Sequence, residues 1–338
     1  MPDGRSVGEN NDKFGRSAMQ GDLTKGKITK TMIIFALPMI LGNLLQQMYN
    51  IADTLIVGQF LGSDALAAVG AAYSLMTFIT SVLLGLCMGS GAVFSICWGE
   101  QNTEKLKSAV FTAFVFIAVL TVILNAAVFL LTDPILRLLN VPEEIYGMMK
   151  SYIWVIFWGI GAVFLYNYFA ALLRAVGNSV VPLIFLAVSA VLNIILDLYF
   201  VLGLRWGVSG AAFATVLAQI VSGVGIGAYT WIKQPNLRPG RRHCRFNSAL
   251  IKELAQFSIL TSVQQSVMNL GILMVQGLIN SFGTVVMAAF AAAVKIDSFA
   301  YMPCRISAMP FRLLSLKITE RKNGRELKRA LKKPSSSR

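Results

Sequence analysis

An aspartate lies in the first long apolar run of the chain, among polar residues at helical spacing. In the stretch LLQQMYNIADTLIVG, Gln46, Asn50 and Asp53 occupy positions i, i+4 and i+7, and Tyr49 precedes Asp53 by four. In a helix these four side chains share one face. A carboxylate at mid-membrane costs about 2.5–3.5 kcal/mol on insertion scales. The polar stripe therefore favours a water-filled cavity; the alternative is an aspartate near the helix end that faces the membrane interface.

A second aspartate, Asp197, lies in the apolar stretch VLNIILDLYF, and Asn193 precedes it by one helical turn. An amide oxygen and a carboxylate on one helix face can bind a hard cation such as Na⁺, or can share a proton. No basic residue in the same run could neutralise Asp197. The sequence thus predicts an ion or proton site here, and the alternative is a polar pair that packs two helices together.

The elements that must hold these residues are membrane helices. Of the 338 residues, 56% are hydrophobic and 14% are charged, whereas a soluble domain has roughly 25% charged residues. A spanning helix needs about 20 mostly apolar residues, and a membrane barrel would instead show short alternating segments. The sequence therefore predicts an all-α polytopic membrane protein with runs at 32–57, 65–96, 108–131, 151–173, 180–202, 207–232, 254–281 and 284–303.

Basic residues fall between the apolar runs and give a formal net charge of +14. Lysine and arginine are more frequent in the N-terminal segment and the even-numbered connections than in the odd-numbered ones. This difference predicts that the N-terminus and the even-numbered connections face the cytoplasm. The charge thereby orients the chain in the membrane, and we expect no nucleic-acid partner. The only histidine, His243, lies beside two arginines and is expected to be a solvated loop residue.

The connection after the sixth apolar run is the longest and most basic, so it is the best candidate for a boundary between two domains. A weak repeat supports it, because Gln46-Gln47 in the first run has a counterpart in Gln264-Gln265 of the seventh. An offset of six helices makes a parallel repeat with its axis along the membrane normal. The predicted organisation is a cytoplasmic segment at 1–30, a first lobe of about six helices at 31–232, a basic cytoplasmic loop at 233–252, the start of a second lobe at 253–303 and a tail at 304–338.

Glycine and proline mark positions where helices can bend or approach closely. Pro38 interrupts the first run, Gly85 and Gly89 lie late in the second, and Gly159 and Gly161 lie in the fourth. Small residues allow close helix contacts, and glycine or proline can also allow a bend. The sequence leaves both readings open, tight packing and a gating hinge.

No catalytic or nucleotide-binding motif is present, neither HExxH, GxSxG nor a P-loop. We therefore expect a protein that is not an enzyme and that uses no cofactor. A membrane enzyme whose two aspartates act as acid and base remains an alternative.

Three stretches together resemble bacterial members of the MATE (multidrug and toxic compound extrusion) family: FALPMILGNLLQQMYNIADTLIVGQFLGSDALAAVG, LYNYFAALLRAVGNSVVPLIFLAVSAVLNIILDLYFV and NSFGTVVMAAFAAAVKIDSFAYMP. The resemblance implies a six-helix N-lobe followed by the start of a second six-helix lobe. It also implies a monomeric, multi-pass protein of the bacterial plasma membrane that contacts lipid. Its activity would be export of small organic cations or other drugs in exchange for Na⁺ or H⁺.

The resemblance also assigns residues. Its ion or proton site corresponds to Asp53, Asn193, Asp197 and Thr215, where Na⁺ is a possible ligand. Its substrate cavity corresponds to Gln46, Tyr49 and Asn167, to which the polar stripe adds Asn50. A related flippase for lipid-linked oligosaccharides is the alternative, and it would favour basic cavity residues.

The family resemblance ends near residue 303, after which the composition becomes basic and polar. The other reading frame of residues 304–338 can encode family-like sequence that begins QDFGNAF. We therefore expect this tail to be a frameshift product and the chain to be an incomplete, inactive product; a non-transporting fragment is the corresponding alternative function.

Overall fold

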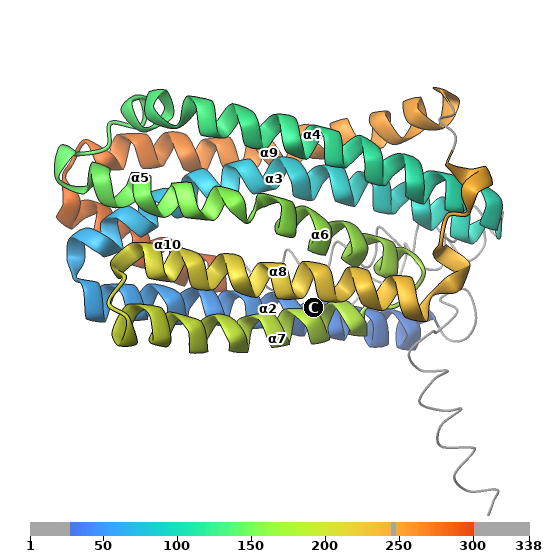
Figure 1. Cartoon of the computed structure of the whole chain (residues 1–338), viewed down its shortest axis with the longest axis horizontal. Helices are drawn as coiled ribbons and strands as arrows, with labels where there is room; N and C mark the ends of the chain where they lie inside the picture. Colours follow the sequence, from blue (N-terminus) through green and yellow to red (C-terminus); the bar gives the residue numbers. More distant parts are fainter. Residues whose placement is uncertain (1–27, 245–247, 301–338) are drawn as a thin grey trace, which may run out of the picture.

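The computed structural model describes residues 28–244 and 248–300 as a bundle of long helices (Figure 1). The described part contains helices and no strands. The helices are α2 (Ile28–Leu61), α3 (Ser63–Gly99), α4 (Thr103–Leu138), α5 (Glu143–Trp158), α6 (Ile160–Ala175), α7 (Val180–Asp197), α8 (Gly207–Lys233), α9 (Ser248–Asn280) and α10 (Thr284–Ala300); η1 (Leu198–Gly203) is a π-helix, and η2 (Pro235–Leu237) and η3 (Arg241–His243) are 3₁₀ turns. The predictions for residues 1–27 and 304–338 lie outside the described residues.

Each of the eight apolar runs forms helix over the residues that the structure describes, which confirms the all-α class. By length and hydropathy, five of the described helices could cross a membrane, or six if the bent pair α5 and α6 is one span. Helix α2, which carries the polar stripe of Gln46, Gln47, Asn50 and Asp53, is not among these five. The shorter helix α10 contains an apolar stretch at Thr284–Val294. The chain is a multi-pass membrane protein.

Two apolar runs depart from a simple helix. The fourth is broken at Gly159, where α5 and α6 meet at 46°, so the bend suggested by its glycines is present. The fifth continues from α7 into the π-helix η1 directly after Asp197. By contrast, α2 is a single helix from Ile28 to Leu61 with Pro38 inside it, so the predicted interruption there is wrong. Helix α2 packs against α3 and α7.

The bundle has two distinct ends (Figure 1). The η1 end holds η1 and the connections α2–α3, α4–α5 and α9–α10, whereas the linker end holds α3–α4, α6–α7 and the segment between α8 and α9. At the linker end, His243 Nε2 lies 2.8 Å from Glu104 Oε2, and the His243 side chain is 13% exposed. His243 is therefore a contact between η3 and α4, and the expectation of a solvated histidine is wrong. Which end faces the cytoplasm stays a prediction.

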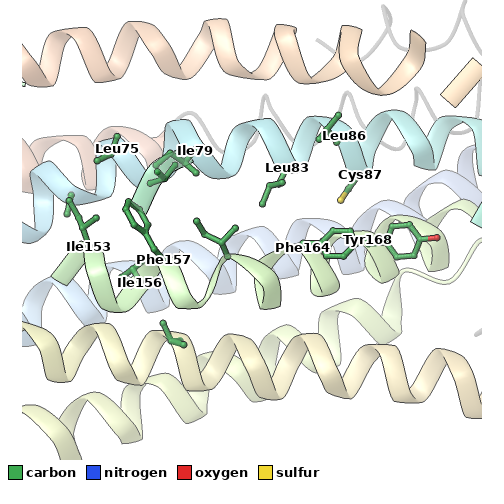
Figure 2. Close-up of a cluster of buried hydrophobic side chains, with 14 of the residues drawn as sticks. Leu75, Ile79, Leu83, Leu86, Cys87, Ile153, Ile156, Phe157, Phe164 and Tyr168 are labelled. Atoms are coloured by element: carbon green, nitrogen blue, oxygen red, sulfur yellow. The ribbon is translucent and has the colours of Figure 1, made fainter. Parts of the chain in front are cut away.

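Helix α3 is the centre of the bundle. In its most apolar window 78% of the residues are buried, against 17% for α4, so α3 is enclosed by other helices while α4 lies at the surface of the bundle. Figure 2 shows part of its core, where Ile79 of α3 lies near Phe157 of α5, and Cys87 of α3 lies near Phe164 and Tyr168 of α6. The hydroxyl of the buried Tyr168 donates to Val110 O at 2.6 Å, which satisfies its polar atom inside the core.

Helix α9, the first of the predicted second lobe, packs along α3. Near the linker end, the Ser90 and Ser258 hydroxyls are hydrogen-bonded at 3.0 Å. Near the η1 end, Ser74 Oγ donates to Gln276 Oε1 at 3.0 Å, and Gln276 Nε2 donates to Asn280 Oδ1 at 2.8 Å. All of these side chains are buried, so buried hydrogen bonds join α3 and α9 near both ends of the bundle.

Replacing Gln276 by Leu should destabilise the α3–α9 contact. The change leaves the Ser74 hydroxyl and Asn280 Oδ1 buried without their hydrogen-bond partner, at a cost of about 1–3 kcal/mol. The thermal unfolding midpoint of the detergent-purified chain measures this loss, and Gln264→Leu, at an exposed glutamine of α9, is the matched control. Equal midpoints for the two variants would contradict the structural role of Gln276.

Candidate ion-binding site

Asp197 is the last α-helical residue before the π-helix η1. Its side chain is fully enclosed, with an exposed fraction of 0%, and Asn193, one turn earlier on α7, is 2% exposed. Asn193 Nδ2 donates to Thr215 Oγ1 of α8 at 3.3 Å. A π-turn widens a helix locally and recurs at functional sites. The structure therefore places Asn193, Asp197 and Thr215 together at the α7–α8 contact.

Several acceptor atoms in this cluster are buried without a hydrogen-bond partner among the described residues. They are Asn193 Oδ1 and both carboxylate oxygens of Asp197. Burying an ionised carboxylate is costly unless a counter-charge or hydrogen bonds compensate. Three buried oxygens on adjacent turns of one helix suit a hard cation or a bound proton, which would remove the cost.

Asp53, on α2, belongs to the same cluster. It is half-buried, and its carboxylate interacts electrostatically with that of Asp197. Helices α2 and α7 pack against each other, and both contact α8. Two neighbouring carboxylates repel each other when both are ionised. A cation or a proton between them relieves this repulsion, so the pair is a better site than either aspartate alone.

Sequence reasoning missed Tyr152 of α5. This side chain is 7% exposed and interacts electrostatically with Asp53, Asp197 and Tyr49. Its hydroxyl adds a fourth helix to the site, because α5 packs against α8 and α3. The sequence could not reveal Tyr152 as a site residue. It lies on a different helix from either aspartate, and these helices meet only in the folded bundle.

The residues predicted to line a substrate cavity differ in their exposure and in their hydrogen-bond partners. On α2, Gln46 is exposed and is a hydrogen-bonding neighbour of the half-buried Tyr49, while Asn50 Nδ2 donates to Gln47 Oε1 at 3.4 Å. On α6, the half-buried Asn167 uses its amide within its own helix and donates to Val163 O at 2.8 Å. Tyr49 thus interacts with Asp53, whereas the places of Tyr49 and Asn167 in a substrate cavity stay predictions.

Comparison with known proteins identifies the chain. The family model MatE matches residues 38–199, which include Asp53, Asn193 and Asp197. The chain is 32% identical over 285 residues to "Probable multidrug resistance protein YpnP" of Bacillus subtilis (strain 168), a match that covers 83% of this chain and 63% of that protein. The chain belongs to the MATE family. A relative named for multidrug resistance and helices long and apolar enough to cross a membrane agree with this assignment.

Other MATE comparisons agree. The chain is 28% identical to "Probable multidrug resistance protein NorM" of Thermotoga maritima, over 82% of this chain and 60% of that protein. Its fold matches a solved transporter of the MOP superfamily from Pyrococcus furiosus with a TM-score of 0.82 and 22% identity, covering 94% of this chain and 69% of the other. The chain thus spans less than two thirds of these curated relatives. The named relatives are transporters, which points to a protein that is not an enzyme.

Proposed function

We propose that this chain carries the ion-coupling lobe of a secondary active multidrug antiporter. The antiporter would export organic cations or other drugs in exchange for Na⁺ or H⁺. The observation that carries the proposal is the buried Asp197 carboxylate, whose oxygens have no hydrogen-bond partner among the described residues, beside Asp53. The names of the relatives support a drug-transport role.

Coupling follows from competition for negative charge. When Asp53 and Asp197 are both ionised, the lobe attracts a cationic substrate. When Na⁺ or a proton binds, that charge is reduced and the hold on the substrate weakens. Because ion and substrate then favour different states, the gradient of one can drive export of the other. Asn193 and Thr215 would supply the remaining oxygens for Na⁺.

The proposal includes an orientation and an assembly state. The N-terminus and the linker end face the cytoplasm, where the Lys- and Arg-rich segment between α8 and α9 would meet the positive-inside rule. The membrane is the bacterial plasma membrane, and the protein acts as a monomer. The substrate is a small molecule, and neither a nucleic acid nor a cofactor takes part.

Ion binding is the first test, because it needs only the described helices. The full chain is purified in detergent and unfolded thermally in sodium chloride or choline chloride at equal ionic strength, at mildly acidic and mildly alkaline pH. A ligand at 100 times its dissociation constant adds about 2.7 kcal/mol of stability. A Na⁺ site should raise the midpoint in sodium but not in choline, whereas a proton site should raise it at acidic pH in both salts.

Export is the second test. The reading frame after residue 303 is corrected, and the resulting protein and the chain as given are each reconstituted in vesicles, where ethidium movement is followed under an imposed Na⁺ gradient or pH gradient. The proposal predicts ion-dependent export of the cationic dye by the frame-corrected protein and none by the chain as given. The proposed function is contradicted if the frame-corrected protein moves no ethidium under either gradient and the stability of the chain responds to neither Na⁺ nor pH.

A further inference from the structure

A polar pocket lies at the η1 end of the bundle, where α4 and α5 meet. It has a volume of about 280 Å³. Asp133 of α4 forms one of its walls, with Lys150 Nζ at 2.7 Å and the Tyr146 hydroxyl donating to its Oδ1 at 2.7 Å. Because Tyr146 and Lys150 are one turn apart on α5, they hold Asp133 from the same face of that helix. The pocket therefore has a fixed, ion-paired wall.

Two further charges line the same pocket. Arg137 of α4 and Glu143 at the start of α5 are both exposed, and neither forms an ion pair with another described residue. Together with Asp133 and Lys150 they give two positive and two negative charges. Since Asp133 and Lys150 neutralise each other, the pocket offers one cation and one anion to a ligand.

An aromatic stripe leads from the pocket along α5 toward the middle of the bundle. Trp154 and Trp158 follow Lys150 by one and two turns, and their residues are 48% and 67% exposed. Phe129 of α4 packs against both, with ring centroids 5.1 Å and 5.4 Å away. On α4, Leu130 is 82% exposed. Tryptophans are enriched where membrane headgroups meet the hydrocarbon, so we expect the pocket to lie at the level of the headgroups and the stripe to face acyl chains.

We propose that this pocket binds one zwitterionic phospholipid with an ammonium headgroup. Arg137 would meet the phosphate, Glu143 would meet the ammonium, and the acyl chains would lie over Trp154 and Trp158. The charge balance carries the choice of ligand, because an anionic phospholipid would leave Glu143 facing a negative headgroup. The site is separate from the ion cluster, and its failure would leave the proposed function untouched.

Fluorescence quenching by brominated lipids tests the site directly. The full chain, with Trp98, Trp206 and Trp231 replaced by Phe, retains Trp154 and Trp158 as reporters; the three replaced tryptophans lie outside the buried core. It is reconstituted in mixed vesicles of phosphatidylethanolamine and phosphatidylglycerol, and only one of the two carries brominated acyl chains. We expect stronger quenching when phosphatidylethanolamine is brominated, at the same lipid ratio.

Two variants and one control complete the test. Arg137→Gln and Glu143→Gln should each remove the preference, so that the two brominated lipids quench equally. Arg205→Gln, at an exposed arginine of the same end that does not line the pocket, should retain it. The proposal is overturned if the parent shows equal quenching by both lipids, if it prefers phosphatidylglycerol, or if the preference survives in both pocket variants.

Discussion

Asp197→Asn should strongly weaken ion binding while leaving the ion-free protein as stable as the parent, or more stable. Neither oxygen of the buried Asp197 carboxylate has a hydrogen-bond partner among the described residues, and Asp53 adds like charge. An ionised carboxylate in this setting opposes folding, and a neutral amide relieves the cost. Residues kept at the expense of stability are characteristic of functional sites.

The size of the expected loss follows from the charge that is removed. A contact to a charged group contributes about 1.5–3 kcal/mol, and each 1.4 kcal/mol is a factor of ten in affinity. Loss of the Asp197 charge should therefore weaken Na⁺ binding by about 10- to 100-fold, or remove the acid-dependent stabilisation if the ligand is a proton. The readout is the shift in the unfolding midpoint between sodium and choline, and between the two pH values.

Asp64→Asn is the matched control, because Asp64 is an exposed carboxylate in the first turn of α3 at the same end of the bundle. It should keep the parent's response to cation and pH. If Asp197→Asn instead lowers the midpoint and still responds to the ion as the parent does, Asp197 is a structural residue and the ion site lies elsewhere.

The helices were predictable because hydropathy alone decides which segments enter a bilayer. Details that depend on neighbouring helices were not. The glycines at 159 and 161 both allowed a bend, and the structure has it at Gly159. At this position α8 lies close to the backbone, because Gln219 Oε1 of α8 would be 3.0 Å from a Cβ on residue 159. The sequence does not record this neighbour. The π-helix after Asp197 leaves no pattern in the stretch LDLYFVLG that differs from an ordinary apolar helix.

In the candidate ion-binding site, too, contacts within one helix were predictable and contacts between helices were not. Spacings of four residues within a helix predicted that Asn193 and Asp197 share a face, and the structure has both buried. Partners on other helices could not be found in this way. Thr215 was available only through family resemblance, and Tyr152 not at all, because no sequence interval records which residues of α5 and α8 meet α7. The roles of all these residues in ion binding stay predictions.

For Gly85 and Gly89 the sequence left packing and hinge equally open, and the structure favours packing. Both lie within the unbroken helix α3 and face the backbone of α9. Their four-residue spacing is the small-xxx-small pattern by which membrane helices approach closely. A Cβ on Gly89 would clash with Ser258 Cα and Phe257 O. At Gly85 it would lie 2.7 Å from Ser262 N and 2.9 Å from the Thr261 carbonyl carbon.

Gly85→Ala should therefore separate α3 from α9, although alanine is the better helix former. In an unobstructed helix the change would add about 1 kcal/mol of stability. Here the methyl group meets backbone that cannot rotate away, and overpacking of this kind costs typically about 1–3 kcal/mol. Gly271→Ala is the matched control, because Gly271 lies in α9 with nothing within 4 Å of its Cβ position; it should be neutral or stabilising.

The separation can be measured as disulfide formation between Ser90→Cys and Ser258→Cys, introduced into a chain whose four native cysteines are serine. The two hydroxyls are 3.0 Å apart in the native contact, so the parent pair should cross-link readily. Gly85→Ala should reduce the cross-linking yield and lower the unfolding midpoint together, because both depend on the same helix contact. If the midpoint falls while cross-linking persists, α9 stays seated and the strain is absorbed within α3. If neither changes, the close approach of the two helices is not a source of stability.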